Sequence, residues 1–379
     1  MTLIIPFKEG QHLQALNVQQ ESKPFHIVSF RFSSLGDVIL STSLFHLLRK
    51  IYGPKLRLSF YTSKAMAPIL ENHPLLDAVY LHSRQKGLRD FKELKKTFKK
   101  IHKDHPVDLI IDHHGSLRTL FLRFSFLSIP RIVLDKRTIE RWLLTTFKVD
   151  FLSRQFNKIE KRKKRLGELL LRRNARDVLP LFSSEDDLHW VEETSPLSSA
   201  ALKENEGSRK KIIAFIPSAS FPEKRWSAEK FYQLIETTLE SEEFSAYKLK
   251  VLAGRDDNFC RIFDKLEEKF PDRFINLQGK TSLLESMEVL NECSFFVGND
   301  TGLPHLAESL NTAGIFILGP TGEEFGFYPH LPFSQVASMD NLWCRPCTTN
   351  GKGNCIRSRR YCLENIEVSS VFQQMKRYL

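Results

Sequence analysis

The chain has 379 residues, of which 41% are hydrophobic and 27% charged. That length predicts two domains of roughly 150 to 200 residues each, and the balanced composition excludes extensive disorder. No run reaches the roughly 18 apolar residues that a membrane span needs. The first ten residues lack the pattern of a secretory signal, so we expect a cytosolic protein.

Strand-like and helical stretches alternate along the first half of the chain. We expect strands at 25–30, 56–61, 78–81 and 107–111, and helices at 38–50 and 91–103. The alternation predicts a parallel sheet with crossover helices.

The net charge of +11 is concentrated in one segment of the chain. Between Arg131 and Arg176 there are 15 Lys and Arg and 5 Asp and Glu, a balance of +10. Apolar residues at helical spacing, such as Ile139 and Trp142, are mixed with these cations. An ordinary helix with a solvated basic face, contact with an anionic membrane, and nucleic-acid binding all remain open, although no nucleic-acid motif is present.

The second half repeats the alternation after a polar stretch at 183–211, which we interpret as a linker. We expect strands at 212–216, 249–253, 294–297 and 314–318, and a helix at 228–239. The sequence therefore predicts an α/β protein with two doubly wound domains across a cleft, whose ligands bind beyond the carboxyl ends of the strands. The expected division is an N-terminal extension (1–24), an N-terminal domain (25–185), a linker (186–211), a C-terminal domain (212–365) and a C-terminal helix (366–379).

Six cysteines fall into two groups. Cys260 and Cys293 are isolated and are expected to be buried thiols. The others form the pattern C-x2-C-x7-C-x6-C at Cys344, Cys347, Cys355 and Cys362. Four thiolates would suit a structural zinc or an iron–sulfur centre, although this spacing matches no standard finger; reduced or disulfide-capable thiols are the alternative.

The loop after the first strand holds Asp37, directly after the turn from Ser33 to Gly36. An aspartate in the first turn of a helix is commonly a cap or a partner of the helix dipole, worth about 0.5–2 kcal/mol. A carboxylate at the carboxyl end of a strand is also well placed as a general base. Both interpretations stay open.

Three further loops carry polar groups after expected strands. The loop at 217–226 brings hydroxyls and two cations to a helix start, which suits an anion site or solvated surface charge. The stretch GNDTG at 298–302 is neither a P-loop nor GxGxxG, but its helix start favours phosphate. After the strand at 107–111, Arg118 is a candidate to hold an anionic acceptor, and the nearby His113 and His114 could ligate metal or merely be displayed by a turn.

Four stretches together resemble glycosyltransferase family 9, the lipopolysaccharide heptosyltransferases. They are FRFSSLGDVILSTSLFHLLR, IDHHGSLRT, FIPSASFPEKRWSAEKF, and VGNDTGLPHLAESL followed by FILGPTGEEFG. The resemblance implies a GT-B fold of two Rossmann-like domains facing a central cleft. The donor would be held by the C-terminal domain, and the acceptor by the N-terminal domain.

The same resemblance implies a set of site residues. Asp37 would be the catalytic base. The donor, ADP-heptose, would contact Ser220, Lys224, Asp300, Thr301, Gly302, His305 and, less clearly, Asp257. The acceptor would contact Gly36, Ser116 and Arg118.

The implied activity is inverting transfer of heptose to the inner core of lipopolysaccharide, without a catalytic cofactor. The implied partners are ADP-heptose, a lipid-anchored oligosaccharide and an anionic membrane surface, with no nucleic acid, at the inner face of the cytoplasmic membrane. One alternative is a family member with another nucleotide sugar or acceptor. The other is a non-catalytic protein that binds anionic glycolipid or nucleic acid.

Overall fold

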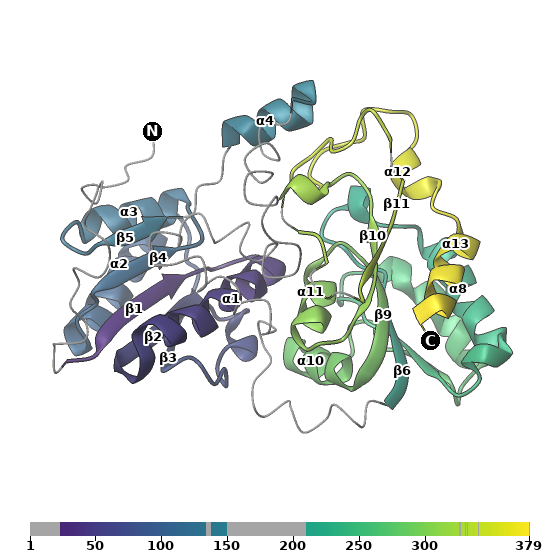
Figure 1. The fold of residues 1–379 in the computed structure, drawn as a ribbon, viewed down its shortest axis with the longest axis horizontal. Coiled ribbons are helices and arrows are strands. Elements are labelled where there is room, and N and C mark those ends of the chain that lie inside the picture. The colour runs from purple at the N-terminus through teal and green to yellow at the C-terminus, as the bar shows by residue number, and fades with distance from the viewer. Residues whose placement is uncertain are drawn as a thin grey trace. The chain divides into compact units, whose positions relative to one another are not determined.

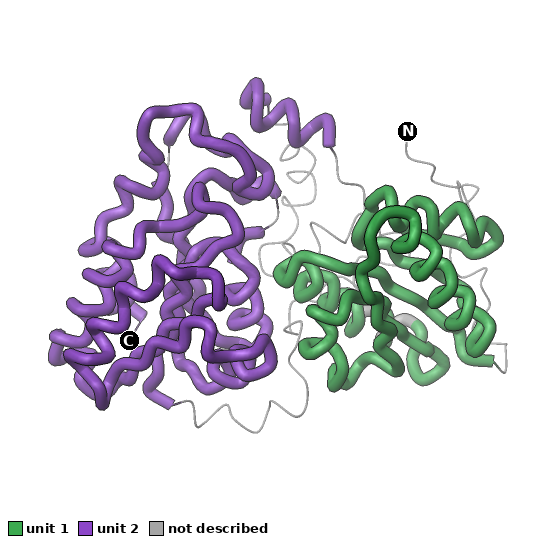
Figure 2. The backbone as a smooth tube through the Cα atoms, turned by 180° about the vertical axis from the view of Figure 1, so that it is seen from behind, with its two compact units in different colours: residues 1–136, 170–200 green, residues 137–169, 201–379 purple. Residues whose placement is uncertain are grey.

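The computed structural model describes residues 23–133, 138–149 and 210–378, the last range without residues 326, 330, 332 and 340. The chain forms two compact units (Figure 2): unit 1 comprises Met1–Lys136 and Leu170–Ala200, and unit 2 comprises Arg137–Leu169 and Ala201–Leu379. Most of the expected N-terminal extension, of the linker and of the basic segment lies outside the described residues.

Unit 1 is built on a parallel sheet of five strands in the order β3-β2-β1-β4-β5 (Figure 1). The strands are β1 (Phe25–Phe30), β2 (Leu56–Ser63), β3 (Ala78–His82), β4 (Leu109–Asp112) and β5 (Arg131–Val133). The helices are α1 (Leu35–Tyr52), α2 (Leu88–Asp104) and α3 (Leu117–Ser125), with short 3-10 turns at Gly53–Lys55 and Ala67–Ile69. Every residue of β1 is buried, as expected for a central strand covered on both faces.

Unit 2 is built on a parallel sheet of six strands in the order β11-β10-β9-β6-β7-β8. The strands are β6 (Lys210–Ile216), β7 (Lys248–Val251), β8 (Phe274–Asn276), β9 (Cys293–Asn299), β10 (Gly314–Leu318) and β11 (Gln335–Ser338). The α-helices are α4 (Thr138–Phe147), α8 (Ala228–Glu240), α9 (Asp264–Lys269), α10 (Leu283–Glu292), α11 (Gly302–Ser309), α12 (Tyr361–Glu364) and α13 (Val368–Tyr378). The 3-10 turns are Pro222–Lys224, Glu242–Phe244, Asn258–Phe263 and Glu323–Phe325.

In both sheets, successive strands are added first on one side of the first strand and then on its other side. In unit 1, β1 lies between β2 and β4, and in unit 2, β6 lies between β7 and β9. Loops that leave the two central strands of such a sheet diverge to opposite sides and leave a crevice at the carboxyl edge, where ligands bind in this class of fold. The topology therefore predicts ligand contacts from the loops after β1 and β4 in unit 1 and after β6 and β9 in unit 2.

The core of unit 2 brings its sheet together with its last helix. Trp226 is almost fully buried, and its indole N–H donates to the Ile366 carbonyl oxygen at 3.1 Å. Val371 and Met375 of α13 are buried in the same apolar cluster as Trp226. Cys260 and Cys293 are fully buried, which confirms the expectation for these two thiols.

The expected α/β, doubly wound class is confirmed, with differences at the boundaries. β4 begins at Leu109 rather than at residue 107, and β6 begins at Lys210, so the last two residues of the expected linker belong to a strand. Helix α4 falls in unit 2, whereas the division drawn from the sequence places these residues in the N-terminal domain. None of the described helices is both long and apolar enough to cross a membrane.

We expect α13 to contribute to the core of unit 2 rather than to lie loosely on it. Met375→Ala should lower the free energy of unfolding by about 2–5 kcal/mol, because the change empties a buried site. The exposed Gln373→Ala on the same helix should change it by less than about 0.5 kcal/mol. Urea denaturation followed by circular dichroism measures both, and equal stabilities would contradict the assignment.

Candidate functional site

One asparagine joins the two loops at the switch point of unit 2. Asn299 is the last residue of β9 and is fully buried. Its Oδ1 accepts from the backbone N–H of Trp226 at 3.0 Å, and its Nδ2 donates to the Pro217 carbonyl oxygen at 2.6 Å. Because buried polar groups need partners, this amide fixes the loop after β6 against the end of β9.

The next residue, Asp300, forms a buried ion pair with Lys224. The Lys224 Nζ lies 2.6 Å from the Asp300 Oδ2, and only 13% of the lysine side chain and 4% of the aspartate side chain are exposed. The Thr321 hydroxyl donates to the same oxygen at 2.9 Å. On the other side, His305 Nε2 lies 3.7 Å from Asp300 Oδ1. The carboxylate is therefore engaged on both of its oxygens.

These partners decide the ionisation of Asp300. Burial alone would raise the pKa of this carboxyl group, but the Lys224 ammonium and His305 outweigh it and hold the pKa well below the usual value. Asp300 is therefore a carboxylate at neutral pH, and its charge holds the lysine ammonium in place.

The Lys224–Asp300 pair lies next to the start of α11. Thr301 is the N-cap residue of this helix, its side chain makes no capping hydrogen bond, and Gly302 is the first helical residue. The first N–H groups of a helix have no partner within the helix, and they carry the positive end of its dipole. His305 is buried one turn later and faces the ring of Phe316. The arrangement suits an anion such as phosphate.

A segment near the C-terminus braces this site. Arg345 donates from Nε and Nη2 to the Thr321 carbonyl oxygen at 3.2 and 3.1 Å. Gly351 has a φ of +87°, and a Cβ atom there would collide with Cγ and Cδ of Lys224. Arg360 donates to the Pro222 carbonyl oxygen at 2.6 Å, beside the lysine. The segment therefore supports both the lysine and the threonine that contact Asp300.

The four late cysteines belong to the same region. Cys344 is buried, and the other three are partly buried. Burial, followed by the neighbouring thiols, raises the pKa of Cys362 to about 11, and burial likewise raises the pKa of Cys347. Among the described residues, which include all four cysteines and also His113 and His114, no three His, Cys, Asp or Glu side chains are arranged to hold a metal ion. The zinc or iron–sulfur centre at the four cysteines and the histidine metal site considered from the sequence therefore stay predictions.

The loop after β7 carries Asp257. Its Oδ2 accepts from the Gly254 backbone N–H at 2.8 Å, and its Oδ1 lies 3.7 Å from Arg225 Nη2. Arg225 also donates to the Ala219 carbonyl oxygen at 2.8 Å, so it ties this loop to the loop after β6. In the same loop Ser220 is exposed.

In unit 1, Asp37 has structural partners on its own loop. It occupies the third position of α1 and forms a capping box with Ser34, whose hydroxyl donates to Asp37 Oδ2 at 2.9 Å. Arg31 pairs with the same carboxylate and also donates to the His113 carbonyl oxygen. Arg31 thus connects the loop after β1 to the loop after β4 and holds the carboxylate at the switch point. Gly36 precedes Asp37 in the first turn of α1.

The loop after β4 is fixed by Asp112. Its Oδ1 accepts from the backbone N–H groups of His114 and Gly115, each at 2.9 Å, and its Oδ2 lies 3.2 Å from Arg123 Nε. Ser116 is the N-cap of α3, and its hydroxyl accepts from the Thr119 N–H at 3.4 Å. The serine hydroxyl is thus used for capping.

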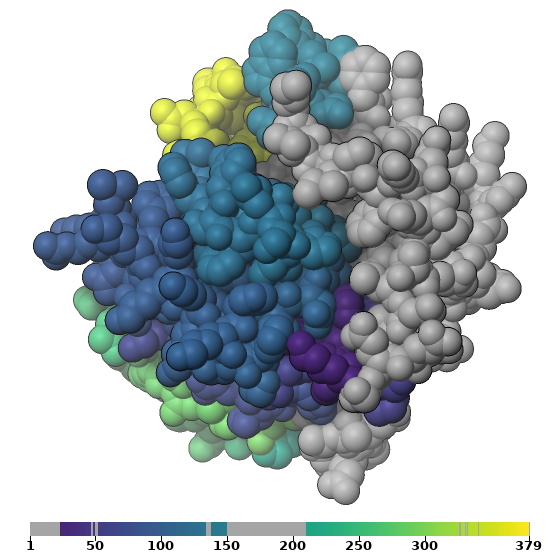
Figure 3. Space-filling model, turned by 90° about the vertical axis from the view of Figure 1, so that its left-hand side faces the viewer, coloured from purple at the N-terminus to yellow at the C-terminus, as the bar shows by residue number. Residues whose placement is uncertain are grey.

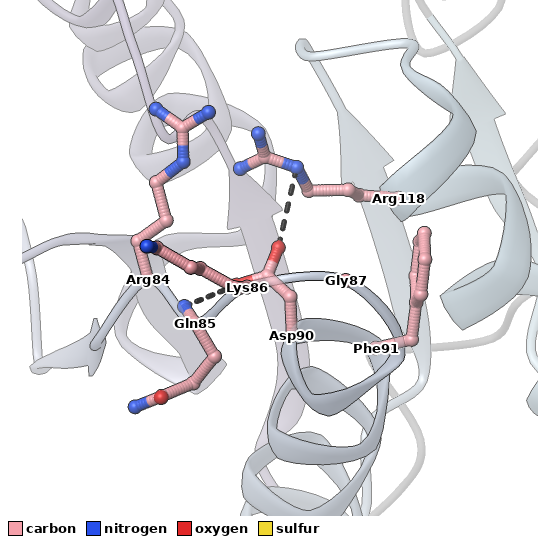
Figure 4. Close-up of a pocket in the computed structure, with 7 residues that line it drawn as sticks. All are labelled: Arg84, Gln85, Lys86, Gly87, Asp90, Phe91 and Arg118. Atoms are coloured by element: carbon pink, nitrogen blue, oxygen red, sulfur yellow. Dashed lines mark hydrogen bonds and ion pairs between the residues drawn. The ribbon is translucent and has the colours of Figure 1, made fainter.

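A pocket of about 630 Å³ lies between the loop after β3 and the start of α3. Figure 4 shows its residues, which include the cations Arg84, Lys86 and Arg118. Asp90 lies buried at this pocket, where it accepts from His82 and from the Gln85 N–H, while Arg118 Nε lies 3.3 Å from its other oxygen. Burial alone would raise the pKa of Asp90, but these contacts lower it overall. The Nη groups of Arg118 point away from Asp90 (Figure 4).

Several residues that build these sites were not among the candidates expected from the sequence. Arg31 directly follows the first strand, and Asn299 begins the turn that was recognised, so both were visible by position. Thr321 lies in the recognised stretch FILGPTGEEFG, but no role was assigned to it, and Arg345 and Gly351 reach Asp300 and Lys224 only through the fold.

A profile of glycosyltransferase family 9 (heptosyltransferase) matches residues 103–354. Because the match spans well over half of the chain, the protein belongs to this family, which confirms the resemblance seen in the sequence. The lipooligosaccharide heptosyltransferase 2 of Haemophilus influenzae is 32% identical over 117 residues, which are 30% of this chain and 33% of that protein. The chain spans between 33% and 51% of the length of the first curated relatives it matches.

Solved structures show the same fold. A family 9 glycosyltransferase from Veillonella parvula superimposes with a TM-score of 0.67 at 19% identity, covering 95% of this chain and 98% of the other. The Escherichia coli ADP-heptose LPS heptosyltransferase II gives 0.62 at 20% identity, covering 93% and 98%. The expected GT-B fold class is thereby confirmed.

Because folding lowers the pKa of Asp300, we expect this residue to make the free energy of unfolding depend on pH. Asp300→Asn should cost about 3–5 kcal/mol of unfolding free energy at pH 7, because Lys224 loses its buried partner. A carboxyl whose pKa is lowered by folding stabilises the protein above its unfolded pKa of about 3.9, and this contribution is lost as the pH falls further. The difference between wild type and variant should therefore shrink below about pH 4.

Urea denaturation at several pH values measures this difference. Asp256→Asn, at an exposed position in the loop after β7, is the control and should have little effect at any pH. A cost for Asp300→Asn that stays constant as the pH falls would contradict the ion-pair account.

Proposed function

We propose that the protein is an inverting glycosyltransferase that transfers heptose from ADP-heptose to a lipid-anchored oligosaccharide of the lipopolysaccharide inner core. Family membership and the names of its relatives support the reaction and the donor. The observation that carries the proposal is the Lys224 ammonium, fixed by a buried carboxylate beside the first turn of α11.

The donor diphosphate binds between Lys224 and the start of α11. The ammonium and the N–H groups of Thr301 and Gly302 supply positive charge where the departing ADP develops negative charge. Asp300 positions the lysine and does not itself contact phosphate, since both of its oxygens are engaged and a carboxylate repels phosphate. His305 supports Asp300 from behind, and the exposed Ser220 hydroxyl offers a further donor.

The nucleoside lies toward the loop after β7. In Rossmann-like domains an acidic residue after the second strand accepts from the ribose hydroxyls. Asp257 is an acid in the corresponding loop, and its position is set by Gly254 and Arg225. We assign it the ribose contact.

Asp37 is the general base. It takes the proton from the acceptor hydroxyl while that oxygen attacks the anomeric carbon from the face opposite the leaving group. The bond between the anomeric carbon and the phosphate oxygen breaks, ADP leaves with the bonding electrons, and the configuration inverts. Arg31 pairs with the carboxylate and orients it.

The acceptor binds to unit 1. The phosphate and carboxylate groups of an inner-core acceptor match the cations around Arg118, whose Nη groups are directed away from Asp90. Gly36 lets the acceptor approach the base closely, and Ser116, in the loop after β4, offers it a further contact. Such an acceptor places the protein at the cytoplasmic face of the inner membrane. The reaction as proposed uses no cofactor, because Lys224 and α11 supply the charge.

The direct test is transfer by the purified protein. With ADP-heptose and core acceptors of graded length, mass spectrometry should find one acceptor that gains a single heptose. ADP should also raise the melting temperature, whereas UDP should not. A response to UDP alone would show that the donor is another nucleotide sugar, and the heptose proposal would fail.

Asp37→Asn tests the role of the base. The amide keeps the shape and an acceptor oxygen for Ser34 but removes the charged partner of Arg31, so the melting temperature and ADP binding of the variant are measured beside its kcat. We expect kcat to fall by about 10²–10⁴, the usual contribution of a positioned base. Asp104→Asn, at the exposed end of α2, is the matched control. A loss of less than tenfold in steady-state assays would remove Asp37 from this role.

A further inference from the structure

Helix α3 has apolar side chains on two opposite faces. At about 100° per residue, Leu117, Phe121 and Phe124 fall within about 60° of one another. The buried Thr119 and Leu122 lie on the opposite side, against the core of unit 1. The inner face of α3 is covered by the core of unit 1, whereas the apolar side chains of its outer face are exposed.

The outer face belongs to a larger exposed apolar patch. Its members lie on α3, just after it and at the start of α2, with these exposed fractions: Leu88 77%, Leu117 72%, Phe121 57%, Phe124 55% and Leu127 59%. The rings of Phe91 and Phe121 lie 4.8 Å apart, so the patch is continuous between the two helices. Figure 3 shows this side of unit 1, where the blue and teal surface of α2 and α3 faces the viewer. A cluster of large exposed apolar side chains of this kind marks an interaction surface.

Cations border the patch. Helix α2 carries seven Lys and Arg and three Asp and Glu, and its exposed lysines include Lys92, Lys95 and Lys99. These three share the face of α2 that begins with Leu88, because they follow it at helical spacing. From Leu117 to Ser128 there are two arginines and no acidic residue. The surface therefore combines apolar side chains with a positive margin.

We propose that this α2–α3 face docks unit 1 onto an anionic lipid bilayer. Leu117, Phe121 and Phe124 enter the boundary between head groups and acyl chains, while the lysines of α2 contact lipid phosphates. A protein partner would not require the excess of lysine, and a free phosphate would not require the apolar side chains. This inference rests on the proposed function, because docking on the bilayer brings unit 1 to a lipid-anchored acceptor.

Binding to vesicles tests the proposal with the full chain. The protein should sediment with vesicles of phosphatidylcholine and phosphatidylglycerol, and less with phosphatidylcholine alone or at high salt. Phe121→Ser/Phe124→Ser should weaken this binding by at least about tenfold, because it removes the inserted rings. The control Phe333→Ser/Leu284→Ser removes exposed apolar side chains of unit 2 and should bind as the wild type does.

A second variant gives a positive signal that does not depend on loss of binding. The emission of Phe121→Trp should shift to shorter wavelength with anionic vesicles and be quenched by brominated lipid, whereas that of Phe333→Trp should not. Unchanged vesicle binding by the double variant, or no quenching, would overturn the proposal. A changed oligomeric mass or melting temperature of Phe121→Ser/Phe124→Ser would also overturn the proposal. A second copy or another part of the chain would then cover the face.

The two proposals fail in different ways. Transfer of heptose to a deacylated, water-soluble acceptor should be the same for wild type and Phe121→Ser/Phe124→Ser. If the wild type binds vesicles but transfers no heptose, the proposed function fails and the docking surface stands. If it transfers heptose but ignores anionic vesicles, the reverse holds.

Discussion

The proposed donor site depends on one buried charge, the carboxylate of Asp300. A carboxylate without partners in such a position would be costly or would take up a proton. Here Lys224, Thr321 and His305 stabilise the ionised form. Because the lysine comes from the loop after β6 and the threonine follows β10, the charge holds together loops that leave separate strands. The same contact fixes an ammonium beside a helix start, and the proposed chemistry uses that geometry.

The central strands were predictable because they are long, apolar and buried on both faces. β1 and β10 have the expected bounds, since both are short, mostly apolar runs between polar turns. The edge strands β5, β8 and β11 were not predicted. They have three or four residues, pair on one side only, and are only partly buried in β5 and β11, so neither apolar runs nor alternation marks them. These segments form strands because each pairs with the strand beside it in the sheet.

The candidate site could be predicted where polar residues lie near the carboxyl end of a strand: Asp300 follows β9 directly, and Asp37 lies in the first turn of the helix after β1. Its supporting residues could not be predicted, because Arg345 and Gly351 reach the site only through the fold. The two interpretations of Asp37 turn out to be compatible: it caps α1 and is also held at the switch point by Arg31. The cysteine spacing pointed to a metal, but spacing alone does not say whether four sulfur atoms converge on one point.

The backbone at Gly351 helps to set the position of the Lys224 side chain, although the two residues are far apart in the sequence. The aliphatic stem of the lysine occupies the volume that any side chain at position 351 would need. Even a methyl group there would push the stem aside and move the positive charge, with no change to the lysine itself. The position of the charge at the proposed donor site can therefore be changed from the C-terminal segment by sterics alone.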